Sequence, residues 1–281
     1  MGALAGLVAS RVAREFHFGG PSHSVCSEDT SGLHALEVAL RALRMQELDV
    51  ALAGAVDLNG DLRSLLANDA VRHYSRSGRA RPFDAAADGA IPGEGAACLV
   101  LKRLADAERD GDRIYAVIRG VGTASGTTSG SRLPAQAAYE QALARAYADA
   151  DVAPASVGLL EAHGSGSPGE DAVEAQALSA FFGRTHASTA ERVIPCHLGS
   201  TKADVGHTGA AAGLVSVVKA SLCLHHQVIP GLRHLERPRA ELAGATRIGL
   251  PRQPRHWVRD RAEGPRRAGV TSTSAEGGCV H

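Results

Sequence analysis

Three turns of the sequence carry side chains that can do acid–base chemistry. His163 opens the run His163-Gly164-Ser165-Gly166-Ser167 directly after an apolar stretch, and Lys202 and His207 lie together in a second turn. A third turn, residues 27–32, holds Asp29. Imidazole and ammonium groups move protons or stabilise an oxyanion when a fold brings them together. Because sites in α/β sheets form in the loops after strands, these positions indicate acid–base or oxyanion chemistry.

Each of these residues also has a purely structural interpretation. Asp29 at the start of a helix is a good N-cap, worth about 0.5–2 kcal/mol. A histidine after a strand can simply satisfy hydrogen bonds in the core, and the turn at His207 can be a tight helix entry. Cys26 offers a thiol, but a small buried residue on a strand is the simpler interpretation. His225 and His226 end an apolar helix, where they complement its dipole, and we favour that role over a metal site.

Apolar periodicity predicts alternating strands and helices that position the turns. Helices are expected over residues 33–43, 135–148 and 209–224. Strands are expected over residues 22–26, 49–55, 96–102, 114–121, 157–162 and 193–198, with 49–55 and 157–162 buried. This alternation indicates a layered α/β fold. Residues 22–44 and 193–224 each pass from a strand through small residues into an apolar helix, which suggests a duplicated unit.

The composition excludes several classes of protein. The chain has 281 residues, of which 44% are hydrophobic, and 30 basic and 30 acidic side chains cancel to zero net charge. Zero net charge is not expected of a nucleic-acid binder or of a polybasic membrane binder. No apolar run approaches the ~20 residues of a membrane span, and the N-terminus lacks the basic region of a signal peptide. The five cysteines form no CxxC pair, so we expect a cytoplasmic protein without a disulfide framework or zinc site.

Read in order, the chain resembles the ketosynthase (β-ketoacyl synthase) family of polyketide and fatty acid synthases. The segments that carry the resemblance are GGPSHSVCSEDTSGLHALEVALRAL, LDVALAGAVDL, RPFDAAADGAIPGEGAACLVLKRLADAERDGDRIYAVIRGVG, EAHGSGSPGEDAVEAQAL and GSTKADVGHTGAAAGLVSVVKASLCLHHQVIPGL. The first histidine motif is similar to the family's EAHGTGT. The resemblance implies a thiolase-like layered α/β/α/β/α fold.

The resemblance also implies roles for individual residues. His163 and His207 correspond to the histidines that assist decarboxylation and stabilise the enolate or tetrahedral oxyanion. Lys202 corresponds to the lysine that organises the site. The residues expected to border the substrate, which is carried on the phosphopantetheine arm of an acyl carrier protein, are Ser165, Ser167, Gly277 and Gly278. The resemblance implies no metal and no cofactor bound by the chain itself.

One departure from the family concerns the nucleophile. Aligned on Pro21, Leu33 and Ala35, the chain has Asp29 where the family has its cysteine. Cys26 lies three residues earlier, and moving it into place would slide the helix by almost a turn. A helix N-terminus stabilises a carboxylate as it does a thiolate, but a carboxylate is a far poorer nucleophile. We therefore do not expect condensation by acyl transfer.

Two further departures concern the C-terminal segment and the length. Residues 272–281 lack the family's phenylalanines that gate the acyl pocket, and Glu276 adds a charge. Only 28 residues precede Asp29, whereas the family has a large additional portion there and continues past His281. We expect one partial domain over residues 1–281, incomplete in its first half. Residues 1–125 would be the remainder of the N-terminal half and residues 126–281 the C-terminal half.

Three functions follow as hypotheses. The first is a non-condensing ketosynthase-like segment of a polyketide or polyunsaturated fatty acid synthase. Like a chain-length factor, it would pair with a ketosynthase subunit or with a second copy, and would meet an acyl carrier protein. The second is a malonyl-thioester decarboxylase that uses His163 and His207, although Asp29 would place a negative charge beside the substrate and keep the imidazoles protonated. The third is a truncated, inactive gene product.

Overall fold

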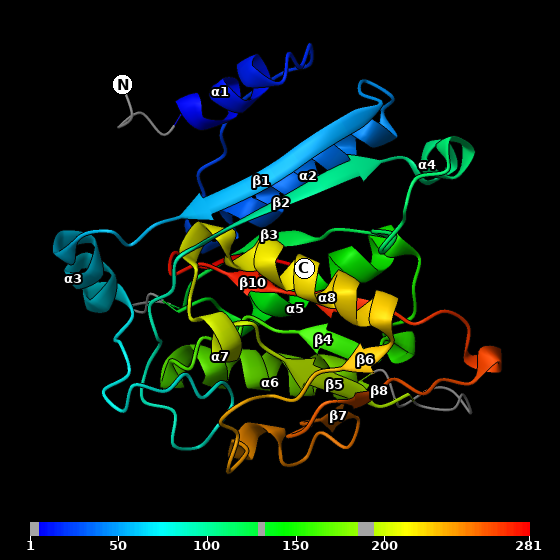
Figure 1. Ribbon diagram of the computed structural model, residues 1–281. Helices are drawn as coiled ribbons and strands as arrows, with labels where there is room; N and C mark the ends of the chain where they lie inside the picture. Colours follow the sequence, from blue (N-terminus) through cyan, green and yellow to red (C-terminus); the bar gives the residue numbers. More distant parts are fainter. Residues whose placement is uncertain (1–5, 129–132, 185–193) are drawn as a thin grey trace.

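The computed structural model describes residues 6–128, 133–184 and 194–281 (Figure 1). The first half contains helices α1 (Leu7–Glu15), α2 (Ser31–Arg44), α3 (Leu62–Val71) and α4 (Leu104–Asp110), with strands β1 (Val50–Asp57), β2 (Gly95–Lys102) and β3 (Thr123–Ser125). A short 3-10 turn, η1 (Glu28–Thr30), leads directly into α2.

The second half follows the same alternation of strands and helices. Its helices are α5 (Gln136–Ala150), α6 (Pro168–Arg184), α7 (Lys202–Val205) and α8 (Ala212–His226). Its strands are β4 (Leu159–Glu161), β5 (Cys196–Gly199), β6 (Val228–Ile229), β7 (Ile248–Gly249), β8 (Arg255–His256), β9 (Ala268–Val270), β10 (Ser272–Thr273) and β11 (Gly278–Val280). Short 3-10 turns lie at η2 (Pro154–Ser156), η3 (Gly209–Ala211), η4 (Ala240–Leu242) and η5 (Arg261–Glu263).

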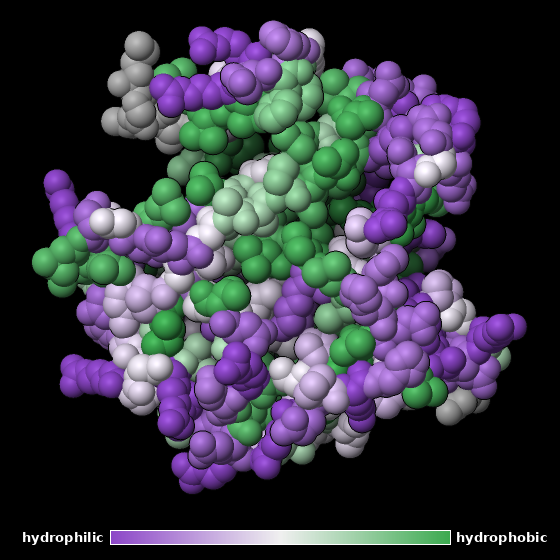
Figure 2. Space-filling model, viewed as in Figure 1, coloured by the Kyte–Doolittle hydropathy of each residue, from purple (hydrophilic) through white to green (hydrophobic). Residues whose placement is uncertain are grey.

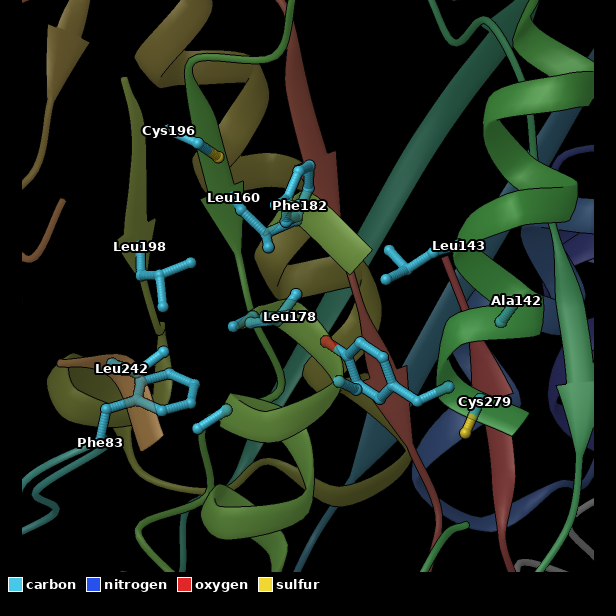
Figure 3. Close-up of a cluster of buried hydrophobic side chains, with 14 of the residues drawn as sticks. Phe83, Ala142, Leu143, Leu160, Leu178, Phe182, Cys196, Leu198, Leu242 and Cys279 are labelled. Atoms are coloured by element: carbon cyan, nitrogen blue, oxygen red, sulfur yellow. The ribbon is translucent and has the colours of Figure 1, made fainter. Parts of the chain in front are cut away.

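A parallel sheet in the order β7-β5-β4-β9 forms the centre of the second half. Leu160 of β4 and Leu198 of β5 pack with side chains of α5 and α6, among them Leu178 and Phe182 (Figure 3). The neighbouring Leu159 points the other way and packs against α8 and its surroundings. Helices therefore cover both faces of this sheet, which explains why β4 reads as a continuous apolar run rather than as an alternating one. The layers predicted from the sequence are present.

Two helix starts meet between the halves. The pair η1–α2 and the pair η3–α8 share one design, a 3-10 turn that continues into an α-helix, and the two pairs lie against each other. A Cβ atom on Gly32 would come within 2.9 Å of the Ala210 carbonyl oxygen, and one on Gly213 would come within 2.5 Å of Leu33. Glycine at both positions lets the helix starts approach closely.

The antiparallel pair β1–β2 differs from its prediction. Ala51 and Ala53 face inward against Leu33 and Leu36 of α2, as expected. The alternate residues point outward and are exposed, including Leu52 at 43% and, opposite it on β2, Val100 at 76%. Figure 2 shows an apolar region over this part of the molecule. The segment 49–55 was expected to be buried, but in the described chain only one of its faces is covered.

Two predicted strands are absent from the described ranges. Residues 22–26 and 114–121 have no helix or strand assignment. The apolar side chains of Ile118 and Val121 do pack on the core formed by α2, β1 and β2. However, side chains bond the backbone there: Asp149 accepts the Val121 N–H at 2.9 Å. Both segments have suitable side-chain patterns, but in the described chain neither pairs with another strand in a ladder.

The other predicted elements are confirmed within a few residues. The helices expected over residues 33–43, 135–148 and 209–224 correspond to α2, α5 and η3–α8. The strands expected over residues 96–102, 157–162 and 193–198 correspond to β2, β4 and β5, although residue 193 lies outside the described residues. Among the described helices, none is long and apolar enough to cross a membrane.

Candidate active site

The turns predicted to carry chemistry converge on one place. Asp29 lies in η1 at the start of α2, His163 follows β4, Lys202 begins α7 after β5, and His207 precedes η3 and α8. The rings of His163 and His207 lie edge to face with centroids 5.4 Å apart, and the His207 Nε2 atom is 3.8 Å from Asp29 Oδ2. The four residues come from both halves of the chain, so the site depends on the contact between the two helix starts.

The surroundings of His163 determine which ring nitrogen carries the hydrogen. Its Nδ1 accepts a hydrogen bond from the Thr273 backbone N–H at 3.2 Å, and Lys202 Nζ lies 3.5 Å from the same atom. The hydrogen of a neutral ring therefore lies on Nε2, which is buried and has no hydrogen-bond partner. Lys202 Nζ also donates to the His163 carbonyl at 2.7 Å, and Glu174 accepts the His163 N–H at 2.8 Å. These contacts fix the ring and its loop.

His207 has the same tautomer for a similar reason. Its Nδ1 accepts the Gly209 backbone N–H at 3.1 Å, so its hydrogen is also on Nε2, and this atom too is buried without a hydrogen-bond partner. The result is a pair of Nε2–H donors, from His163 and His207, that both face the space beside Asp29. Such a pair is suited to stabilising an oxyanion.

The surroundings of both imidazoles favour the neutral form. Burial lowers the pKa of His163, and the positive charge of Lys202 lowers it further. Burial lowers the pKa of His207 well below its usual value, and Arg72 and Lys202 act in the same direction. The expectation that Asp29 would keep these rings protonated is therefore wrong, because desolvation and two nearby cations outweigh the carboxylate. Burial also lowers the pKa of Lys202, to about 8.

A charged network that the sequence did not reveal completes the site. Arg72 Nη2 donates to Asp29 Oδ2 at 2.8 Å, and Arg72 Nε donates to both carboxylate oxygens of Glu170 at 2.9 and 2.8 Å. Burial would lower the pKa of Arg72, but the charges of Glu170 and Asp29 raise it above its usual value. Arg72 gives no local signal in the sequence, since its two partners lie 43 and 98 residues away. Glu170 lies within the segment that includes the first histidine motif.

The residues predicted to border the substrate are placed as follows. Ser165 is fully buried, and its hydroxyl donates to Glu170 Oε2 at 2.5 Å. The backbone N–H of Ser167 donates to Ser165 Oγ at 3.1 Å. Gly277 lies in the turn between β10 and β11 at a positive φ of 82°, and Gly278 is the first residue of β11. Substrate contact by these four residues stays a prediction.

A cavity of about 350 Å³ opens in front of Asp29. Arg72 and His207 line it, as do four acidic or thiol side chains, Cys26, Glu28, Asp57 and Glu276. Cys26 is exposed there and does not lie on a buried strand, so its structural interpretation is wrong. Within the described residues, no group of three or more histidine, cysteine or acidic side chains has a metal-binding arrangement.

The charged network makes a prediction about stability. Replacing Arg72 with methionine removes the only cation bonded to both Asp29 and Glu170 among the described contacts, leaving a buried and a partly buried carboxylate without that partner. We expect Arg72→Met to lower the free energy of unfolding by about 3–5 kcal/mol, measured by urea denaturation. The control is Arg41→Met, which breaks an exposed pair with Glu37 and is expected to change stability by less than about 0.5 kcal/mol. Equal, small effects of both substitutions would contradict the described network.

The neutral imidazoles predict a pH dependence. A histidine whose folded-state pKa lies below its unfolded value of 6.5 binds a proton on unfolding, so its contribution to stability is lost as the pH falls below that value. The trend is opposed by Asp171, because burial raises the pKa of its carboxyl to about 7. Comparison with His207→Gln isolates the contribution of the His207 ring. Between about pH 7.5 and about pH 5.5, the free energy of unfolding of wild type should fall by about 1 kcal/mol more than that of His207→Gln. The exposed His226→Gln is the control and should follow wild type. Parallel curves for wild type and His207→Gln would show that folding does not lower the pKa of His207.

Known proteins are similar to this chain in sequence and in fold. Residues 1–107 match the family described as "Beta-ketoacyl synthase, N-terminal domain", and residues 115–236 match "Beta-ketoacyl synthase, C-terminal domain". The phthioceranic/hydroxyphthioceranic acid synthase of Mycobacterium tuberculosis is 40% identical over 277 residues, which are 98% of this chain and 13% of that protein. A mycocerosic acid synthase-like polyketide synthase of the same species is 38% identical, over 100% of this chain and 13% of that protein.

Solved structures agree with the sequence matches. The ketosynthase from module 6 of the bacillaene synthase of Bacillus subtilis superposes with a TM-score of 0.90 at 32% identity, covering 97% of this chain and 49% of that one. An oxazolomycin ketosynthase domain of Streptomyces albus superposes with a TM-score of 0.90 at 34% identity, covering 99% and 48%. The chain thus spans about half the length of these ketosynthases. The resemblance and the thiolase-like α/β fold predicted from the sequence are confirmed, and the chain belongs to the β-ketoacyl synthase family of polyketide synthase ketosynthases.

Proposed function

We propose that this chain is a non-condensing ketosynthase-like component of a polyketide synthase, comparable to a chain-length factor. The observation that carries the proposal is the ion pair between Asp29 and Arg72, 2.8 Å apart, at the start of α2. By the resemblance, the family's nucleophile would occupy this position, but here a carboxylate does, and a largely buried guanidinium donates a hydrogen bond to it. A carboxylate held in this way is a poor nucleophile toward a thioester, because attack would break the ion pair and yield a reactive anhydride.

Decarboxylation without a covalent intermediate is the second candidate, and the two Nε2–H donors favour it. They are suited to stabilising the enolate left after a malonyl thioester loses carbon dioxide. The charges argue against it. His207 Nε2 lies 3.8 Å from Asp29, and His163 Nε2 lies 3.7 Å from Glu170. Two like charges about 4 Å apart repel by ~4 kcal/mol at an effective dielectric constant of 20. Arg72 bonds to both carboxylates but carries only one positive charge against their two negative charges. We therefore rank the non-condensing function first.

The outer face of β1–β2 supports a role in an assembly. Leu52, Val56 and Val100 are exposed on this face, side by side with the Cys98 thiol. Contiguous exposed apolar surface of this kind is typical of an interface. The proposed partners are a ketosynthase subunit or a second copy, together with an acyl carrier protein whose phosphopantetheine arm presents the acyl group. All five cysteines are free, which fits the reducing cytoplasm that we propose as the location.

Intact-mass spectrometry with acyl-carrier-protein thioesters tests the missing nucleophile. We expect no acyl adduct on the wild-type chain. We expect Asp29→Cys to be acylated, because the helix start and Arg72 would stabilise a thiolate at that position. Pairing each protein with Cys26→Ser shows which thiol reacts. An acyl adduct on wild type, at any residue, would overturn the non-condensing function.

The proposed interface can be tested by labelling cysteine thiols that the chain already carries. Cys98 is exposed on the outer face of β1–β2, and Cys26 is exposed at the cavity on another part of the chain. A maleimide should label both thiols in the isolated chain. In the assembled synthase, we expect Cys98 labelling to fall by about tenfold or more while Cys26 stays reactive. Undiminished labelling of Cys98 would show that the apolar face is not an interface.

An isolated chain that is monomeric and melts cooperatively would argue against the third hypothesis, a truncated product that folds poorly.

A further inference from the structure

Two carboxylates, not one, occupy the space in front of the imidazoles. Glu170 Oε2 lies 3.7 Å from His163 Nε2, and Asp29 Oδ2 lies 3.8 Å from His207 Nε2. Each Nε2–H donor thus faces an oxygen anion of the protein at a distance slightly longer than a hydrogen bond. Arg72 bonds to both of these oxygens and so joins the two halves of the site.

We propose that Glu170, Asp29 and Arg72 form an internal plug, that Glu170 is the specificity-determining residue that excludes anionic, malonyl-type thioesters, and that Arg72 positions both carboxylates. The inference rests on the proposed function and deepens it. Loss of the cysteine alone would leave the two donors free to bind an enolate. The plug removes that residual possibility, because the protein's own carboxylates stand where the substrate's anionic oxygen would bind.

Several contacts hold Glu170 in the plug. The Ser165 hydroxyl donates to Glu170 Oε2 at 2.5 Å, and Arg72 Nε binds both carboxylate oxygens. Glu170 also lies in the first turn of α6, where the helix dipole favours a negative charge. Burial would raise the pKa of Glu170, but the charge of Arg72 holds it well below its usual value. The carboxylate is therefore ionised and fixed in front of His163.

The position of Arg72 suggests what happens when the plug is removed. Its guanidinium comes from the end of α3, where its backbone N–H is bonded to the Asn68 carbonyl at 2.8 Å. If both carboxylates become neutral amides, the guanidinium stays in place without an anion. It would then lie beside two Nε2–H donors as a receptor for the carboxylate of a malonyl group.

The test is a gain of function with malonyl-pantetheine as the probe. In the decarboxylation, the bond between the carboxylate carbon and the α-carbon breaks. Carbon dioxide leaves, the electron pair forms the enolate, and a proton from water gives acetyl-pantetheine. We expect no acetyl-pantetheine from wild type, and formation at least about tenfold above background from Asp29→Asn/Glu170→Gln. The gain should disappear when His207→Ala is added and should fall when Arg72→Met is added.

Control variants distinguish the effect of the plug from the effect of overall charge in the cavity and from loss of folding. Glu28→Gln/Glu276→Gln removes two charges from the same cavity, yet neither residue has a described contact with the imidazoles, so no gain is expected. The single variant Glu170→Gln keeps the ion pair between Asp29 and Arg72. It replaces the double variant in a binding test if the double variant is unstable. We expect it to bind malonyl-pantetheine about tenfold more tightly than wild type, with a shift of the His163 Nε2 resonance in the NMR spectrum.

The outcomes are distinguishable from failure of the proposed function. Folded Asp29→Asn/Glu170→Gln that neither binds nor decarboxylates malonyl-pantetheine better than wild type would overturn the plug, while leaving the non-condensing function intact. An acyl adduct on wild type would overturn the non-condensing function. An equal gain in the Glu28→Gln/Glu276→Gln control would show that overall charge, and not Glu170, excludes the substrate.

Discussion

A largely buried guanidinium bonded to two carboxylates from opposite halves of the chain is the interaction around which this site is built. Arg72 lies at the end of α3, Asp29 at the start of α2 and Glu170 in the first turn of α6. Burying three charges is unfavourable unless each is paired with good geometry. Their pairing ties the start of α2 to the loop of His163, and the three side chains together carry one net negative charge.

The scaffold explains how the two imidazoles are held in place. The parallel sheet ends at His163 and Lys202, and the close approach of α2 and α8 brings His207 to the same point. Backbone N–H groups of Thr273 and Gly209 fix the tautomer of each ring. These contacts depend on the backbone of the fold and not on the residue at position 29. The proposed function is therefore compatible with two well-placed donors beside an ion pair at position 29.

The sequence allowed much of the fold and part of the site to be predicted. The turns at His163, Lys202 and His207 were recognisable because each reactive residue directly follows an apolar strand or precedes an apolar helix. The strands expected over residues 22–26 and 114–121 failed because a strand needs a partner, which a local pattern does not supply. Arg72 was missed for the same kind of reason, since its role exists only through contacts with residues 43 and 98 positions away. The exposed face of β1 was missed because alternation does not say what covers a sheet.

The arrangement separates two properties that the family combines, the covalent holding of an acyl group and the stabilisation of an anion. In the function that we propose, Asp29 removes the first property, and the carboxylates bonded to Arg72 oppose the second. The most direct test is a crystal structure of the wild-type chain soaked with malonyl-pantetheine. The account predicts that Arg72 stays bonded to both Asp29 and Glu170, with no ligand between the two imidazoles. A thioester or carboxylate oxygen within hydrogen-bond distance of both Nε2 atoms, with Arg72 displaced, would contradict it.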